Sequence, residues 1–338
     1  MIRNAVLQSL RRSGPHLVLG RAGLDFYAEP PGASVEEAET FRAALGGSSA
    51  NIAVAIVKNG GRAHLVTRVA ADPIGRRCVR ELQSYGVNTD HVRPEGGDAR
   101  NSLAVITSRV RDFQSTIYRN GAADFAMNEA DVAGLPYEGA ASLILTGTVL
   151  AAEPSRSAAF TAIERARNAG VPVVFDVDYR PYSWPSSAFA RDVLWRAVEA
   201  SSLVVGNDEE WDWLAGGEPT YQSETQRDFS AAVERAKTAA RDRIVIFKRG
   251  PAGSTTFGHD EGTGEMVGFE TPAFAVEAMK PVGAGDAFLG TLYAAIALGA
   301  DLEDAVQRGA AAAAITVTRF GCAPAIPTPD EIDALRDR

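Results

Sequence analysis

Short apolar runs alternate with segments of helical periodicity along most of the chain. Short apolar runs bounded by turn formers are typical of buried strands. In the longer segments apolar residues recur every three or four positions, which predicts helices that bury one face. The alternation therefore predicts an α/β fold with a mostly parallel sheet and helices on both of its faces. The predicted strands are 16–20, 63–69, 142–146, 173–177, 203–206 and 243–248; the predicted helices are 49–58, 75–85, 154–169, 186–200, 223–240, 284–298 and 302–317.

The segment 98–119 breaks this alternation. Two β-patterned runs, 102–108 and 114–119, flank a polar turn at 109–112. Two such runs joined by a short polar turn predict a β-hairpin. The hairpin could extend the main sheet or belong to a separate one, and the pattern alone leaves both open.

In residues 280–288, Pro281 and Gly283 interrupt regular secondary structure, and a strongly apolar run begins at Ala287. We therefore expect a buried helix from about Ala284. Free N–H groups at a helix start attract anions, and Gly283 and Gly285 would let an anion approach the backbone. Asp286 would repel a phosphate that was only bound there, but it suits a base that removes a proton from a nucleophile. A carboxylate that merely serves the helix dipole fits the spacing equally well.

Composition narrows the class of protein. The chain has 338 residues, 46% of them hydrophobic, which is enough for one large α/β domain. Its net charge of −9 does not suit non-specific binding of nucleic acid. Two cysteines and four scattered histidines argue against a disulfide framework or a Cys-rich zinc site. No run approaches the roughly 20 apolar residues of a membrane helix, so we expect no membrane association and a cytoplasmic location, with residues 1–14 as a loose extension.

A second glycine-led helix start, Gly46-Gly47 followed by Ser-Ser-Ala-Asn-Ile-Ala, stands near the other end of the chain. Together with the 283–286 loop it resembles the two signatures of the ribokinase-like (PfkB) family of sugar kinases. The resemblance runs from about Val18 to Phe320. It implies a single ribokinase-like domain over 1–338. It also implies a small β-sheet lid over the sugar site, built from segments near 24–46 and 98–126.

The resemblance also implies roles for the C-terminal loop. Asp286 would be the base that activates the sugar hydroxyl, and Gly283, Ala284 and Gly285 would hold the transferred charge. ATP would be the phosphoryl donor. Neither the dinucleotide-fold glycine pattern nor the ending of a P-loop occurs in the chain, so nucleotide binding is expected from the resemblance alone.

Two further segments resemble the family's nucleotide and metal elements. Asn207 and Glu210 match an Asn-x-x-Glu motif that helps to organise Mg²⁺ and the phosphates, often through water. Lys248, Gly250 and Gly253 would line the nucleotide site. The alternatives are that Asn207 caps the following helix and that 249–253 is only a tight turn between two strands.

On the sugar side, Asp25 and Asn51, together with Gly46 and Gly47, match family positions that hold sugar hydroxyls. As single residues Asp25 and Asn51 could equally be cap or turn formers.

Two arginines resemble those of the acid-sugar branch of the family. Arg119 lies in Tyr-Arg-Asn-Gly-Ala-Ala-Asp, and Arg180 follows Asp178 in Asp-x-Asp-Tyr-Arg-Pro. Arginine binds a carboxylate bidentately and keeps its charge, so both would meet the acid group of the substrate. Without the resemblance, a solvated arginine or one paired with a surface acid would be the simpler interpretation.

This resemblance implies phosphorylation of the primary hydroxyl of 5-dehydro-2-deoxygluconate, in inositol breakdown. A 2-dehydro-3-deoxygluconate kinase is the first alternative, followed by a fructokinase or ribokinase. A non-catalytic sugar- or nucleotide-binding regulator on the same fold remains an alternative of a different class.

The chain departs from the family pattern at one place. Family members commonly have Asp-Thr or Asp-Pro before the loop, and this chain has Lys280-Pro281-Val282. It puts a monovalent-cation site in question. A homodimer paired through the lid is a further expectation.

Overall fold

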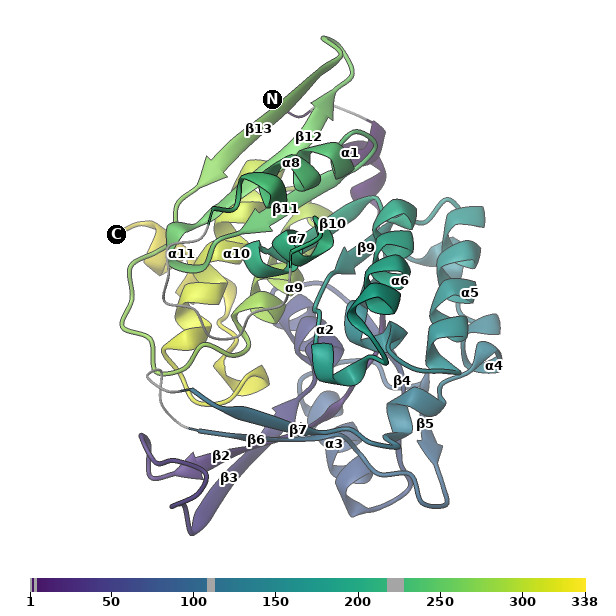
Figure 1. Cartoon of the computed structure of the whole chain (residues 1–338), viewed down its shortest axis with the longest axis vertical. Helices are drawn as coiled ribbons and strands as arrows, with labels where there is room; N and C mark the ends of the chain where they lie inside the picture. Colours follow the sequence, from purple (N-terminus) through teal and green to yellow (C-terminus); the bar gives the residue numbers. More distant parts are fainter. Residues whose placement is uncertain (1, 3–4, 108–112, 218–227) are drawn as a thin grey trace.

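The computed structural model describes residues 2, 5–107, 113–217 and 228–338. In this part of the chain the main layer is a nine-stranded sheet with the order β13-β12-β11-β10-β9-β8-β1-β4-β5 (Figure 1). Neighbouring strands from β11 through to β5 are parallel, and β12 and β13 add an antiparallel edge. The strands are β1 (His16–Leu19), β4 (Ala63–Ala70), β5 (Val92–Glu95), β8 (Ser142–Thr146), β9 (Val173–Asp176), β10 (Leu203–Asn207), β11 (Ile244–Lys248), β12 (Ser254–Asp260) and β13 (Glu265–Thr271).

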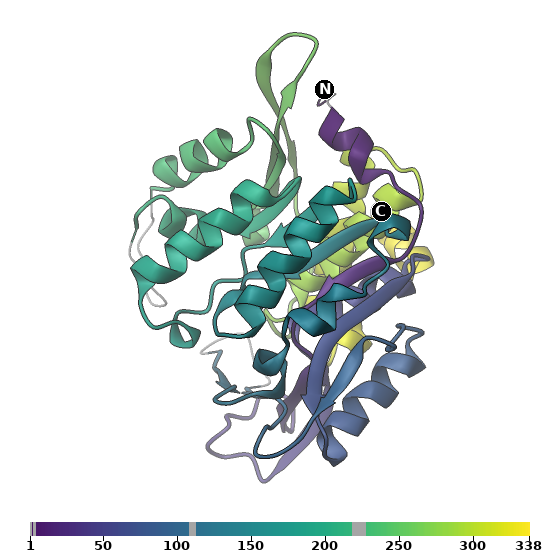
Figure 2. The ribbon, with the colours of Figure 1, turned by 90° about the vertical axis from the view of Figure 1, so that its right-hand side faces the viewer.

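Helices cover both faces of this sheet, as the alternation predicted (Figure 2). The helices that bury apolar residues in the core of one face are α1 (Ala5–Leu10), α2 (Ser48–Lys58), α3 (Pro73–Ser84), α9 (Ala284–Ala297), α10 (Leu302–Val317) and α11 (Pro329–Arg336). Those of the other face are α4 (Glu129–Ala133), α5 (Ser155–Asn168), α6 (Ser187–Ala200), α7 (Asp208–Leu214) and α8 (Ser230–Ala239).

A second, four-stranded sheet has the order β3-β2-β6-β7. Strands β6 (Leu103–Ile106) and β7 (Ser115–Tyr118) pair antiparallel, which confirms the predicted hairpin and assigns it to this separate sheet. The polar turn expected at 109–112 lies outside the described residues. Strand β2 (Gly23–Glu29) pairs antiparallel with β3 (Thr40–Gly46) and parallel with β6.

The sequence predicted a loose extension over residues 1–14, and this is wrong for residues 5–10. Residues 5–10 form α1, in which Leu7 and Leu10 are buried against the core. The apolar spacing of Leu7 and Leu10 explains why this segment docks rather than remaining free. The pattern also missed β5, the β12–β13 hairpin and the short helices α4, α7 and α11. Helix α8 begins at Ser230, and residues 223–227 of the predicted 223–240 helix lie outside the described part.

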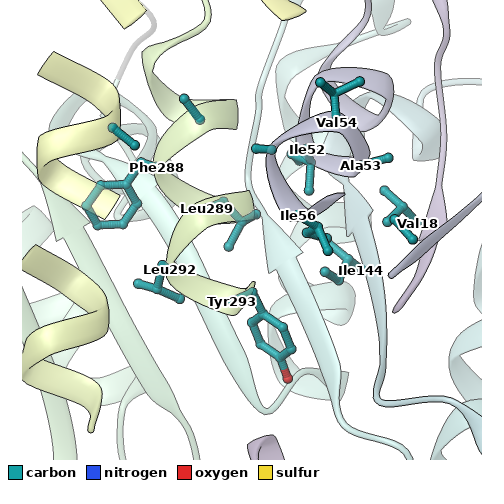
Figure 3. Packing of buried hydrophobic residues seen from close by; sticks show 14 of the residues in the cluster. Val18, Ile52, Ala53, Val54, Ile56, Ile144, Phe288, Leu289, Leu292 and Tyr293 are labelled. Carbon is teal, nitrogen blue, oxygen red and sulfur yellow. The ribbon is translucent and has the colours of Figure 1, made fainter. Parts of the chain in front are cut away.

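Close packing of α2 against α9 sets the position of the site. A Cβ at Gly290 of α9 would lie 2.4 Å from the Ala55 Cβ and 2.6 Å from the Ile52 carbonyl oxygen of α2. Glycine at 290 therefore lets the two helices approach closely, and Figure 3 shows apolar residues such as Leu289 and Ile56 packed at this level. The two glycine-led helix starts, distant in sequence, thus come together above the sheet. Within the described residues, no helix has both the length and the apolar character needed to cross a bilayer.

Candidate active site

The N-terminus of α9 has the geometry of an anion-binding loop. Gly283 is its N-cap with φ 86°, and a Cβ there would lie 3.0 Å from the Cys322 Sγ, so glycine is needed for both conformation and space. A Cβ at Gly285 would lie 3.1 Å from the Lys248 Nζ. The lysine ammonium and the N-terminal N–H groups, beginning with that of Ala284, therefore converge on one place, where they would attract a phosphate.

Asp286 lies in the first turn of this helix and accepts a hydrogen bond of 2.8 Å from the Asn51 Nδ2 in α2. Burial raises the pKa of Asp286 to about 7, the carboxylates of Asp178 and Asp176 add to the rise, and Asn51 and Lys248 oppose it. A carboxyl group with a pKa near neutrality can take up and release a proton at physiological pH, which is the requirement for a general base. The structure therefore brings together two residues that the sequence placed in separate motifs.

Acidic residues outnumber basic ones around Lys248. Its Nζ lies 3.9 Å from the Asp176 Oδ1 at the end of β9. Burial alone would lower the pKa of Lys248, but Asp176, Glu210 and Asp286 raise it by more. Burial also raises the pKa of Asp176. A cluster of buried ionisable groups whose pKa values are displaced by burial and by like charges is typical of catalytic sites.

Glu210 and Asn207 form the capping box of α7. The Asn207 Oδ1 accepts from the Glu210 N–H, and the Glu210 carboxylate accepts from the N–H groups of Asn207 and Tyr179, so the predicted capping role of Asn207 is confirmed. Burial, followed by the charge of Asp176, raises the pKa of Glu210 to about 7. Both carboxylate oxygens are already engaged, and among the described residues no group of three acidic, histidine or cysteine side chains could hold a metal ion.

On the side of the small sheet, Asp25 explains why glycine occupies position 46. A Cβ on Gly46 would lie 2.1 Å from the Asp25 Oδ1, so the carboxylate crosses the space that any other residue would fill. Gly47, with φ 98°, is the N-cap of α2. Asp25 is buried and accepts a hydrogen bond from the Tyr27 hydroxyl, and burial raises its pKa. The Asn51 Oδ1 is buried without a hydrogen-bond partner among the described residues, which leaves an acceptor for a ligand hydroxyl.

The two predicted arginines lie on either side of Thr148. The Arg119 Nη1 donates to the Thr148 carbonyl at 2.9 Å, and the Thr148 hydroxyl donates to Asp178. Each arginine already has an acidic partner: Arg119 pairs with the buried Asp124, and Arg180 pairs with Asp178 at 2.7 Å. Asp178 itself has φ 34°, an unusual backbone conformation for a residue other than glycine. The two arginines therefore come close to one another. Both are paired with acids of the chain, as in the simpler interpretation, although the two acids are buried rather than on the surface.

Sequence reasoning missed a third arginine. Arg21 follows the end of β1, and its charge influences the pKa values of Asp25, Arg119 and Tyr182. It has no acidic partner within 4 Å among the described residues; its Nη1 lies 3.4 Å from the Ser102 Oγ. The available signal was positional, because ligands of parallel sheets bind at the carboxyl ends of the strands.

The segment 249–253 forms the tight turn that was the alternative to a nucleotide role. It joins the antiparallel strands β11 and β12, and the Arg249 N–H donates to the Gly253 carbonyl at 2.8 Å. Gly253 has φ 85°, and a Cβ there would meet the Thr271 carbonyl oxygen at 2.2 Å. Gly250 has φ 51°, and a Cβ there would meet nothing within 4 Å. The turn thus explains both glycines without a ligand. A separate surface depression of about 690 Å³ lies at the C-terminal end of α5. It is lined by Ala133, residues 135–139, Arg165, Asn168 and Ala169.

Comparisons with known proteins identify the family of the chain. The model of the pfkB family carbohydrate kinases matches residues 16–329. The chain belongs to this family and is an ATP-dependent carbohydrate kinase. A 5-dehydro-2-deoxygluconokinase of Photobacterium profundum is 36% identical over 92% of this chain and 91% of its own length. Two solved structures are each 24% identical to this chain over 96% of its length, with a TM-score of 0.80. One is fructokinase of Xylella fastidiosa with ATP, and the match covers 98% of that chain. The other is a double mutant of fructokinase of Vibrio cholerae with fructose, ADP and potassium, and the match covers 99% of that chain.

Proposed function

We propose that the chain transfers the γ-phosphoryl group of ATP to the primary hydroxyl of 5-dehydro-2-deoxygluconate. The observation that carries the chemistry is the pairing of Asp286 with Asn51 beside the Lys248 ammonium at the start of α9. The substrate assignment is supported by the relatives of that name and by Arg21, Arg119 and Arg180, whose charges gather around Tyr182. A carboxylate that leaves water must find charged partners, and neutral sugars have no such need.

In the proposed reaction, the Asp286 carboxylate takes the proton of the sugar hydroxyl as its oxygen attacks the γ-phosphorus. The new P–O bond forms while the bond to the β-phosphate oxygen breaks, and ADP leaves with that electron pair. The N–H groups of Ala284 and Gly285 and the Lys248 ammonium would hold the charge of the phosphoryl group in flight. Asn51 would orient Asp286 and offer its free Oδ1 to the sugar.

The acidic residues around Lys248 fit a hydrated magnesium ion better than a directly bound one. Mg²⁺ keeps several waters and uses few carboxylates. We place it near Asp176 and Glu210, held through water, because both Glu210 oxygens already accept N–H bonds. When bound, it would neutralise phosphate charge.

The small sheet carries Asp25, and we propose that this sheet acts as the lid that excludes water from the phosphoryl group.

Phe41 and Tyr118 are exposed on the two outer strands of the small sheet, β3 and β7. We propose that these strands pair with a second copy of the chain. Sedimentation would then give the mass of a homodimer; a monomer at all concentrations would reject this contact. We assign the enzyme to the cytoplasm, where ATP is available.

The deciding experiment compares kcat/KM for 5-dehydro-2-deoxygluconate, 2-dehydro-3-deoxygluconate, fructose and ribose. Arg180→Lys keeps the charge but loses the planar fork, so we expect a loss of about 10- to 100-fold with the acids and little change with the neutral sugars. Arg21→Lys tests the third arginine in the same way. A preference for fructose or ribose, unaffected by either variant, would refute the acid substrate. Turnover with none of the four sugars would reject the proposed substrate.

A further inference from the structure

Lys280 is a buried cation held by the backbone. The residue is only 3% exposed. The Nζ donates to the Val282 carbonyl at 2.6 Å and to the Thr316 carbonyl at 3.2 Å. Among the described residues, no carboxylate lies within ion-pair distance of it. Most buried lysines pair with an acid, so an ammonium held by carbonyl oxygens needs another explanation.

Both carbonyls belong to segments that shape the anion-binding loop. Val282 directly precedes Gly283, the N-cap of α9. Thr316 lies in the last turn of α10, shortly before Cys322, whose Sγ packs against Gly283. The ammonium therefore joins the backbone before the loop to the backbone that supports it from behind.

The surroundings of this ammonium resemble the coordination that proteins offer to an alkali cation. Backbone carbonyl oxygens are the usual ligands of such ions. Burial lowers the pKa of Lys280, and the nearby groups Cys322, Asp25 and Asp286 oppose that effect. A free alkali ion at this place would meet an ammonium with which it cannot share the carbonyls, so the residues present do not fit a bound monovalent cation.

We infer that the Lys280 ammonium takes the place of an alkali cation beneath the phosphoryl-binding loop and makes the enzyme independent of potassium. The inference rests on the proposed phosphoryl transfer at that loop. The tethered charge holds the Val282 carbonyl, fixes the approach of the chain to Gly283 and adds positive potential where the transferred group arrives. Because it is covalently attached, the charge is present whatever ions the solution contains.

The first test needs no variant. The wild-type enzyme is assayed with its best substrate in a tetramethylammonium buffer, and then with Na⁺, K⁺ or NH₄⁺ at constant ionic strength. We expect kcat to change by less than about twofold. An increase of more than about fivefold with K⁺ would overturn the inference while leaving the kinase function intact. No turnover in any salt would instead count against the proposed function.

The second test opens the space that the ammonium fills. Lys280→Ala should lower kcat at least about tenfold in tetramethylammonium, as the loss of one preorganised charge does, and K⁺ or NH₄⁺ should restore much of it. Lys280→Met fills the space with an apolar chain, so its kcat should stay low in every salt. Rescue of the alanine variant alone separates an electrostatic role from a purely structural one.

Lys58 provides the matched control, because its Nζ also donates to backbone carbonyls, at 2.7 Å to Ile326 and 3.3 Å to Pro324. Lys58→Ala should lose stability without making kcat depend on cations. The inference fails if folded Lys280→Ala is fully active without cations, or inactive and rescued by none. If both Lys280 variants fail to fold, the wild-type salt series still decides.

Discussion

Individual charged residues in the site are tuned by neighbours from distant segments. Asp286 is flanked by Asn51 from α2, and it feels the carboxylates of Asp176 at the end of β9 and of Asp178 just beyond it. Arg119 is fully engaged with Asp124 and Thr148, and it packs over the Phe125 ring at 4.0 Å. Arg119 thus contributes a fixed positive charge at the edge of the site, whereas Arg180, whose side chain is 42% exposed, has more freedom to meet a ligand.

Asp286→Asn should lower kcat by about 10²- to 10⁴-fold with little change in nucleotide affinity, because the amide keeps the shape but cannot accept the proton. The pKa of about 7 gives the sign of the pH dependence: below it Asp286 is protonated and cannot act as a base. Wild-type kcat/KM should therefore rise as the pH increases through about 7. Steady-state kinetics from pH 5.5 to 9 measure both effects, and near wild-type kcat in the variant would remove Asp286 from the mechanism.

At the level of elements, helix α9 carries both chemistry and packing on different turns. Gly285, in the first turn, leaves room for the Lys248 ammonium, and Gly290, one turn and a half later, leaves room for α2. The same residue type thus serves two purposes that only the surroundings distinguish.

Substituting each glycine by alanine separates these purposes. Gly285→Ala crowds Lys248 but improves helix propensity, so we expect kcat/KM for ATP to fall at least about tenfold with Tm unchanged or higher. Gly290→Ala forces α2 and α9 apart and should cost about 1–3 kcal/mol of stability. Thermal melts and ATP kinetics on both variants provide the comparison. A Gly285→Ala enzyme with normal ATP kinetics would contradict the anion-site assignment.

Across the whole molecule, the site residues gather at the carboxyl ends of the parallel strands of the main sheet. Asp176, Asn207 and Lys248 end β9, β10 and β11, and Arg21 follows β1. The small sheet contributes Asp25 from β2, which lies close enough to feel the charge of Arg21. Parallel strands all end on one side, and the crossover helices deliver their N-termini there, so polar groups from the full length of the chain meet in one place.

This concentration of acids should make stability depend on pH. Asp286 and Glu210 have pKa values raised to about 7, above those of the unfolded chain, so the folded state holds extra protons between about pH 4 and 7. The contribution of these groups to the free energy of unfolding therefore falls as the pH rises through that window. Asp286→Asn removes one such charge and should raise Tm at pH 8 by about 2–5 °C, and by less at pH 5. Calorimetry at both pH values tests this; a variant less stable at pH 8 would contradict it.

Much of the fold could be predicted because its signals are local. Apolar periodicity located the six predicted strands, and the glycines at 46–47 and 283–285 marked two helix starts, since a positive φ or a close approach leaves little choice of residue. Weak or short patterns, such as that of β5 or α11, could not be recognised before neighbours supplied their packing.

The sequence by itself determined the order of the elements and the helix starts, and it singled out Asp286 as the candidate base. Only the tertiary structure decided which charges became partners. It joined Asn51 to Asp286, paired Arg119 with Asp124 and held Lys280 on carbonyls from α10 and the loop before α9. The physical reason is range: periodicity and backbone conformation act over a few residues, whereas burial and pairing of a charge depend on segments that meet only when the sheet and helices assemble.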